Sequence, residues 1–132
     1  MKVVIVDGQG GKMGQMLIEQ IKNIPCELVA VGTNSIATSV MLKAGADAGA
    51  TGENPVIVAS RNADVIIGPV GIISADSLLG EVTPAMAIAI GQSKAKKLLI
   101  PVNLCNNIIV GTRSLTMAKL IEETVGELKK MV

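Results

Sequence analysis

The chain has 132 residues, a formal net charge of +1, and neither histidine nor any aromatic residue. It is 49% hydrophobic and 17% charged, which excludes a disordered chain and predicts a single domain over residues 1–132. Lack of histidine removes the commonest general base and metal ligand, and lack of aromatic rings removes base stacking, so we expect no metal site and no nucleic-acid partner.

The apolar residues exceed what one small core should need, so we expect part of them to lie in a homo-oligomer interface. The longest uncharged stretch runs from Leu98 to Thr112 and is interrupted by Pro101, so it is not a membrane span. The N-terminus runs directly into a strand and meets Asp7 early, which is unlike a signal peptide. These features predict a cytoplasmic protein without a membrane partner.

The N-terminal half alternates short apolar runs with helical periodicity. Residues 2–6 are a continuous Val/Ile run, typical of a buried parallel strand, and 27–32 form a second such run. Residues 12–24 carry apolar side chains at helical spacing until Pro25, and Asn34 and Gly45 cap a predicted helix over 35–44. Residues 46–53 are small or polar and predict a loop.

The next segment, 55–61, is ambiguous, because Asn54-Pro55 favours a helix start whereas Val56-Ile57-Val58 favours a strand. We predict a short helix, because a crossover is needed before the strand at 64–68. The remaining expected elements are helices at 75–79, from 84 to about 91, and at 114–131, with strands at 97–102 and 108–111.

Strands that alternate with helices, and that lack polar alternation, indicate a parallel sheet covered on both faces. We therefore predict a doubly wound, Rossmann-like α/β fold of about five strands with helices on both faces. Right-handed crossovers favour the strand order 3-2-1-4-5.

The loop after the first strand is the strongest motif. It spaces Gly8, Gly11 and Gly14 as G-x-x-G-x-x-G between a strand and an amphipathic helix, where unpaired amides and the helix dipole favour a phosphate. We expect Gly10 or Gly11 to let the backbone approach the phosphate, and Gly11→Val to abolish binding without unfolding the protein. The predicted binding residues of this loop are Gly8, Gln9, Gly10, Gly11, Lys12, Met13 and Gly14. The alternative is that a tight turn merely requires glycine.

The cofactor class stays open. The end of the second strand carries Thr33 and Asn34 rather than the acid that usually holds a ribose diol, and no arginine is near for a 2′-phosphate. NAD or NADP is expected, with another nucleotide or a small phosphorylated ligand as the alternative. A second turn, Gly68-Pro69-Val70, and the rim residue Asn103 complete the predicted cofactor contacts.

Two resemblances follow from these motifs. Gly8 to Gly14 is similar to the nucleotide loop of dihydrodipicolinate reductases, whose second, substrate-binding domain has no counterpart here. The loop, together with Gly32-Thr33-Asn34, residues 49–54, residues 68–71 and Pro101-Val102-Asn103, resembles a family of short bacterial proteins that carries only a domain-of-unknown-function label. The second resemblance supports a site at the carboxyl ends of the strands and brings no activity with it.

Three classes of function remain open. The first is a nucleotide-binding module, the second a small oxidoreductase-type enzyme completed at a subunit interface, and the third a non-catalytic oligomeric scaffold. Asp7 and Cys105 are the catalytic candidates. Asp7, at the end of a buried strand, is expected either to have a raised pKa or simply to cap the loop amides. Cys26 and Cys105 are expected at opposite edges of the sheet, and therefore unpaired.

Overall fold

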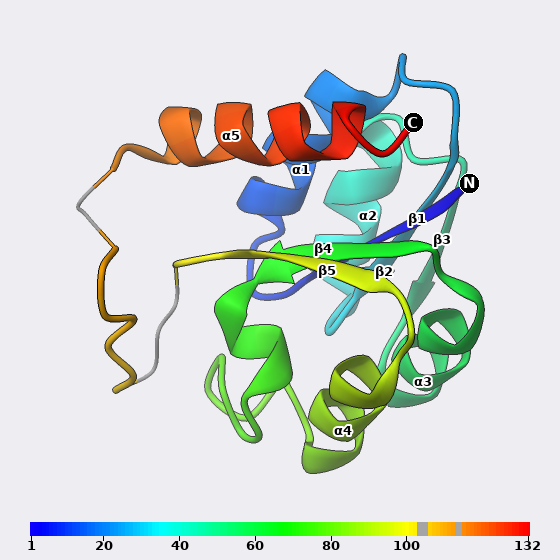
Figure 1. Cartoon of the computed structure of the whole chain (residues 1–132). Coiled ribbons are helices and arrows are strands. Elements are labelled where there is room, and N and C mark those ends of the chain that lie inside the picture. The colour runs from blue at the N-terminus through cyan, green and yellow to red at the C-terminus, as the bar shows by residue number, and fades with distance from the viewer. Residues whose placement is uncertain (103–105, 113–114) are drawn as a thin grey trace.

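The computed structural model describes residues 1–102, 106–112 and 115–132. Its centre is a five-stranded, all-parallel sheet in the order β3-β2-β1-β4-β5 (Figure 1). The strands are β1 (Lys2–Asp7), β2 (Glu27–Gly32), β3 (Ala48–Thr51), β4 (Val65–Pro69) and β5 (Lys96–Ile100). The helices are α1 (Lys12–Ile21), α2 (Ser35–Ala44), α3 (Glu53–Asn62), the short 3₁₀ helix η1 (Val70–Ile73), α4 (Pro84–Gln92) and α5 (Met117–Lys129).

Helices cover both faces of the sheet, which confirms the doubly wound α/β prediction. Alternate residues of β1 point to opposite faces: Val3 and Ile5 pack with α1, α2 and α5, whereas Val4 and Val6 pack with α3, η1 and α4. All four of these valine and isoleucine side chains are buried. Burial on two sides thus explains the continuous apolar run over residues 3–6 of the strand.

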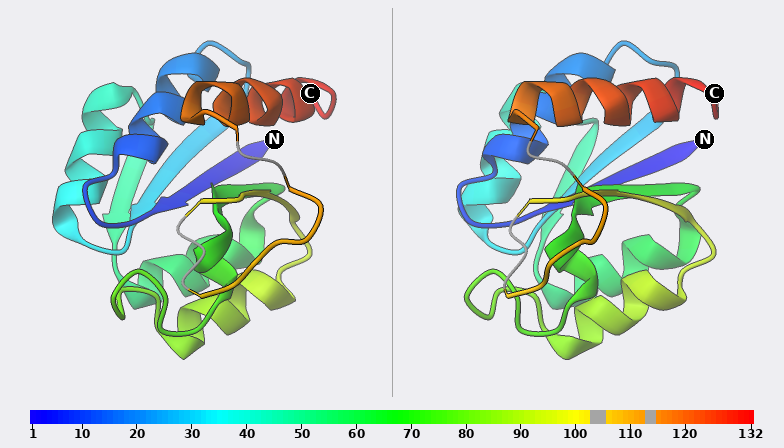
Figure 2. Two further views of the ribbon diagram at one scale, coloured as in Figure 1. Left: turned by 90° about the vertical axis from the view of Figure 1, so that its left-hand side faces the viewer. Right: turned by 60° about the vertical axis from the view of Figure 1, so that its left-hand side comes forward.

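Because the strands are parallel, their carboxyl ends share one edge of the sheet, which lies on the left of Figure 1 and faces the viewer in the left-hand view of Figure 2. In register, Asp7 of β1 lies beside Gly32 of β2. The strand order reverses between β1 and β4, which pair with each other at the centre of the sheet. This edge is where doubly wound folds place ligands.

The sheet has the expected pattern 3-2-1-4-5, but different segments fill it. The third strand along the chain is Ala48–Thr51, which the sequence predicted as loop, so Val65–Pro69 is the fourth strand and pairs with β1 instead of lying beyond β2. Strand β3 has the sequence Ala-Gly-Ala-Thr, which has little strand preference. It forms because its backbone pairs with β2 at the edge of the sheet, Ala48 opposite Val29 and Thr51 opposite Gly32. Segment 55–61 is helical, as predicted, within α3.

Two other predicted elements are wrong. Residues 108–111 form no strand but an exposed loop, in which Ile108 and Val110 are 87% and 93% exposed. Residues 75–79 form turns rather than a helix, because Asp76, Leu78 and Leu79 have positive φ angles of 65°, 55° and 55°. Neither apolar content nor periodicity alone specifies these backbone conformations.

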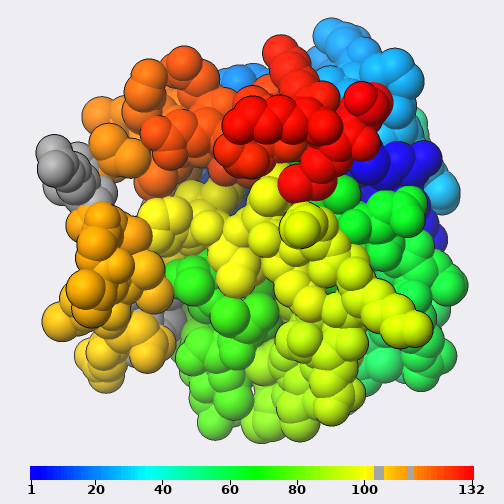
Figure 3. All heavy atoms as spheres, viewed as in Figure 1, coloured from blue at the N-terminus to red at the C-terminus, as the bar shows by residue number. Residues whose placement is uncertain are grey.

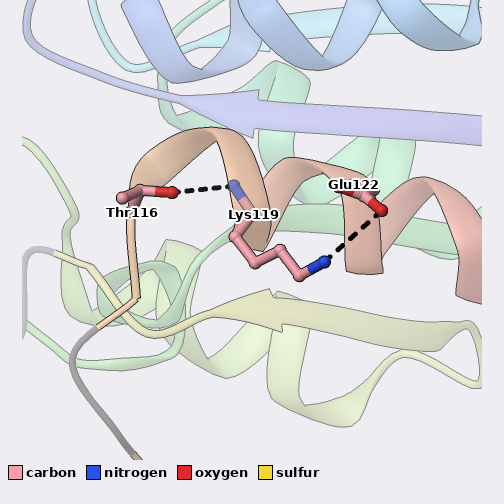
Figure 4. A network of polar contacts seen from close by, with 3 residues as sticks. All are labelled: Thr116, Lys119 and Glu122. Carbon is pink, nitrogen blue, oxygen red and sulfur yellow. Dashed lines mark hydrogen bonds and ion pairs between the residues drawn. The ribbon is translucent and has the colours of Figure 1, made fainter.

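The start of α5 is fixed by a side-chain cap, shown in Figure 4. The Thr116 hydroxyl accepts a hydrogen bond from the Lys119 amide at 3.2 Å, and the Lys119 ammonium pairs with Glu122 at 3.5 Å. The predicted helix 114–131 therefore begins at Met117. Met117, the first residue of the helix, lines a pocket together with Asp7 at the carboxyl end of β1.

The two edge strands of the sheet are β3 and β5, and β5 pairs only with β4 among the described strands. Figure 3 shows atoms around β5, in yellow, at the surface beneath α5. A groove of about 520 Å³ between these two elements is lined in part by Leu98 and Leu120.

The homo-oligomer predicted from the apolar composition remains a prediction. No helix within the described residues is both long and apolar enough to cross a membrane.

Candidate functional site

The glycine-rich loop between β1 and α1 is held in shape by Asp7. The Asp7 carboxylate accepts hydrogen bonds from the Gly8 amide and from the Gly14 amide, each at 2.8 Å. A further bond joins the Gly11 amide to the Gly8 carbonyl at 2.9 Å. The interpretation of Asp7 as a cap for the loop amides therefore agrees with the geometry.

Burial raises the pKa of Asp7, because its side chain is almost fully enclosed. The hydrogen bonds from the Gly14 and Gly8 amides act in the opposite direction, and the negative charge of Glu81 adds to the increase. The net direction is upward, as the sequence led us to expect.

The glycines of the loop have different roles. At Gly14, an added Cβ would lie 2.4 Å from the Met41 sulfur of α2, so this glycine permits close packing of α1 on α2. At Gly8, it would lie 2.4 Å from the Thr33 hydroxyl, which permits close contact with the loop after β2. At Gly10, an added Cβ would have no neighbouring atom within 4 Å, so this exposed glycine faces open space.

Gly11 does not lie where the sequence led us to expect. It is buried, has a φ of 71°, and an added Cβ would stand 2.8 Å from the Ala37 Cα of α2. The structure contradicts the premise that a valine at Gly11 would stand on the surface of the fold, because the new side chain would meet the backbone of α2 rather than solvent. Close approach of a ligand to the backbone is possible at Gly10.

Within the part of the chain that the structure describes, four loop amides have a hydrogen-bond acceptor and three have none. The amides of Gly8, Gln9, Gly11 and Gly14 donate to the protein itself. The amides of Gly10, Lys12 and Met13 have no hydrogen-bond acceptor among the described residues. They lie at the N-terminus of α1, where the helix dipole favours an anion.

A pocket of about 460 Å³ opens beside these amides. Asp7, Gln9, Gly10 and Lys12 form its polar lining, and its apolar wall consists of Met13, Met16 and Met117. The size and the apolar lining with few polar groups are typical of small-molecule sites. Met16 and Met117 were missed from the sequence, where they look like ordinary helix residues.

The end of β2 carries an acid after all, but one delivered from elsewhere in the chain. Glu81, in the loop between η1 and α4, accepts hydrogen bonds on Oε1 from the Thr33 hydroxyl at 2.6 Å and the Asn34 amide group at 2.8 Å. The same oxygen accepts the Gln9 amide at 2.9 Å. Sequence reasoning missed Glu81, since it lies 47 residues from Asn34; its only signal is a place in the loop after the second glycine turn.

The Asn34 side chain connects the start of α2, the glycine loop and the loop that carries Glu81. Its Oδ1 accepts the Ala37 amide at 2.9 Å and so caps α2, as predicted. Its side-chain nitrogen donates to the Gln9 carbonyl as well as to Glu81, each at 2.8 Å. Thr33 and Asn34 are thus next to the glycine loop, although their contacts are with the protein.

Glu81 remains charged in this setting. Partial burial raises its pKa, but the hydrogen bonds from Thr33, the Gln9 amide and Asn34 outweigh that effect, so the net pKa is lowered. Two carboxyl groups, Asp7 and Glu81, therefore flank the glycine loop with opposite pKa shifts.

The second glycine turn lies beside the first, because β4 pairs with β1. Gly68 and Pro69 are buried in β4, and a Cβ at Gly68 would lie 2.4 Å from the Val6 carbonyl, so this glycine serves strand pairing. Val70 is accessible and lines a second pocket of about 340 Å³ with residues of η1 and 107–109. Asn103 and Cys105 lie outside the described residues, and Cys26 is a free thiol.

No group of three or more acidic, cysteine or histidine residues within the described ranges could hold a metal ion. The chemistry available at this edge consists of backbone donors, two carboxyl groups, the exposed Lys12 ammonium and small polar side chains. The backbone donors and the ammonium group can bind an anion.

No curated protein and no solved structure matches the chain significantly. The likeness of Gly8 to Gly14 to the loop of dihydrodipicolinate reductases is therefore not shown by relatives and stays an interpretation. One family model matches residues 2–132, nearly the whole chain. The chain belongs to that family, which is described as a domain of unknown function, DUF3842.

Proposed function

We propose that the protein is a nucleotide-binding module that holds a phosphate on the loop from Gly8 to Gly14, with a dinucleotide such as NAD or NADP as the leading ligand. One observation carries this proposal: the amides of Gly10, Lys12 and Met13 have no acceptor among the described residues, while the loop's other amides are already paired. The loop is thus preorganised by internal bonds that leave its outward donors for an anion.

The surroundings support a nucleotide rather than a bare anion. The free amides adjoin the methionine-walled pocket, which offers apolar surface to a base or ring. Lys12 is exposed at the start of α1 and supplies a positive charge to a phosphate. The site also lies at the point where the strand order reverses.

The first test is a thermal-stability panel with NAD, NADP, ATP, GTP, FMN and S-adenosylmethionine. A ligand present at 100 times its Kd should stabilise the fold by about 2.7 kcal/mol. Stabilisation by none of them would contradict the proposal and favour the oligomeric scaffold. Turnover of a bound nucleotide would instead favour the enzyme completed at a subunit interface.

We expect Gly10→Val to keep the fold and weaken nucleotide binding by about 100-fold or more, because the side chain obstructs donors that are worth several kcal/mol to a charged ligand. Gly91→Val is the matched control, since a Cβ at Gly91 also meets no atom within 4 Å and Gly91 lies in α4. Titration calorimetry on both variants measures the difference. Unchanged affinity in Gly10→Val would show that the phosphate loop is misassigned.

Binding should also depend on pH through Asp7. A phosphate placed beside the loop adds negative charge near this carboxyl and raises its pKa further, so the complex takes up protons. Affinity should therefore be greatest below the folded pKa of Asp7 and fall as the pH rises through it. Calorimetry in buffers of different ionisation enthalpy measures the proton uptake; its absence would place the phosphate away from Asp7.

A further inference from the structure

Glu81 places a carboxylate at the carboxyl end of β2, although the sequence has no acid there. Its Oε1 is within hydrogen-bond distance of Thr33 Oγ1 and Asn34 Nδ2, the two residues that follow the strand. Register places the end of β2 directly beside the end of β1, from which the glycine loop starts. In doubly wound nucleotide sites this is the position at which an acid binds the ribose hydroxyls.

Hydrogen bonds to one oxygen of the Glu81 carboxylate fix its orientation. Oε1 accepts all three donors, from Gln9, Thr33 and Asn34, while Oε2 has no hydrogen-bond partner among the described residues. Three fixed donors on one oxygen determine where the other oxygen lies. A preorganised acceptor of this kind suits a neutral pair of hydroxyl donors.

The loop that carries Glu81 is built to hold it in place. Leu78 is buried, and the backbone bonds Asp76 N to Val82 O, at 2.7 Å, and Val82 N to Ser77 O, at 3.2 Å, close the loop. Within it, Asp76, Leu78 and Leu79 adopt positive φ angles that side chains other than glycine seldom take. Such backbone persists only where surrounding contacts enforce it, and it is frequent at binding sites.

The Glu81 carboxylate and the proposed phosphate donors are remote along the chain but close in space. Gln9 donates its amide to Glu81, and the next residue, Gly10, carries the first free amide. A nucleotide whose phosphate lies on the Gly10, Lys12 and Met13 amides would thus place its ribose towards Glu81.

We propose that Glu81 Oε2 accepts hydrogen bonds from the ribose diol of the bound nucleotide, so that the site takes NAD and rejects the 2′-phosphorylated NADP. This inference rests on the proposed nucleotide binding. The carboxylate repels a 2′-phosphate, and no lysine or arginine of the described residues forms an ion pair with Glu81 to offset that repulsion. The lowered pKa of Glu81 keeps the charge in place at neutral pH.

The test compares NAD and NADP affinities of the wild type and of Glu81→Gln by titration calorimetry. The wild type should bind NAD at least about tenfold more tightly than NADP. Glutamine keeps an acceptor for Gln9, Thr33 and Asn34 but replaces Oε2 by a donor. In Glu81→Gln the affinity for NAD should fall about tenfold or more, and the ratio of the two affinities should approach one.

Glu53→Gln is the matched control, because the Glu53 carboxylate accepts the Thr83 hydroxyl at 2.6 Å next to the same loop without contact to Thr33 or Asn34. It should leave the NAD to NADP ratio unchanged. A ligand-side comparison needs no variant: wild-type protein should bind 2′-deoxy-NAD about tenfold more weakly than NAD. This comparison stands even where Glu81→Gln fails to fold.

The outcomes separate the two proposals. Binding of NAD and NADP with equal affinity, or a preference that Glu81→Gln leaves unchanged, would overturn the role of Glu81 and leave the phosphate loop intact. Full affinity for 2′-deoxy-NAD would do the same. Binding of no nucleotide at all would overturn the proposed function and this inference together.

Discussion

Gly11→Val is expected to lower the free energy of unfolding by about 2–5 kcal/mol, from overpacking and from a side chain at positive φ. A Cβ at this position would lie 2.8 Å from the Ala37 Cα and 3.0 Å from the Ala37 carbonyl oxygen, so backbone of α2 must move. The φ of 71° adds strain for any residue with a branched side chain.

Urea unfolding followed by circular dichroism gives the stability change directly. Gly10→Val is the matched control on the same loop, because a Cβ there meets no atom within 4 Å, and it should unfold within about 1 kcal/mol of the wild type. Wild-type stability in Gly11→Val would mean that α2 does not pack on the loop as described. The pair thus separates the glycine required for folding from the glycine proposed to face the phosphate.

Asp7→Ala is expected to lower the free energy of unfolding by about 2–6 kcal/mol, because the Gly8 and Gly14 amides would each lose a buried acceptor and an unsatisfied buried donor costs about 1–3 kcal/mol. Both bonds are 2.8 Å long, and Asp7 is 4% exposed. Loss of both bonds releases the loop from the start of α1, so nucleotide binding should fall as well. Chemical denaturation at neutral pH measures the loss; a change below about 0.5 kcal/mol would contradict the capping role.

Asp7→Asn provides the conservative comparison, since its single carbonyl oxygen satisfies only one of the two amides. The pH dependence of the difference between wild type and Asp7→Asn isolates this carboxyl. Because the folded pKa of Asp7 is raised, its contribution to stability is fully present below the unfolded value and is lost as pH rises through the folded pKa. The wild type should therefore lose stability relative to Asp7→Asn as pH rises.

Local sequence was sufficient to predict those elements whose own residues have a clear preference for strand, helix or turn. The Val/Ile run of β1, the helix cap at Asn34 and the loop from Gly8 to Gly14 all lie where the sequence predicted them. The doubly wound class followed from the alternation of buried strands with amphipathic helices. Each of these features depends on residues within a few positions of one another.

Elements without an intrinsic preference could not be predicted in this way. The small residues of β3 become a strand because β2 offers an open edge, whereas the apolar residues at 108–111, which resemble a strand, have no strand beside them among the described residues. Asp76, Leu78 and Leu79 adopt positive φ angles that no local sequence pattern predicts. Pairing partners and tertiary contacts decided these segments.

The sequence by itself determined the position of the glycine-rich loop from Gly8 to Gly14, because glycines at fixed spacing between a strand and a helix specify a local backbone. Only the tertiary structure decided which glycine is open and which is packed, since Gly10 and Gly11 differ by what α2 brings near them. It also decided that Glu81 supplies the acid at the end of β2, across 48 residues of chain. Contacts between segments remote in sequence arise from sheet topology and packing, which no single segment encodes.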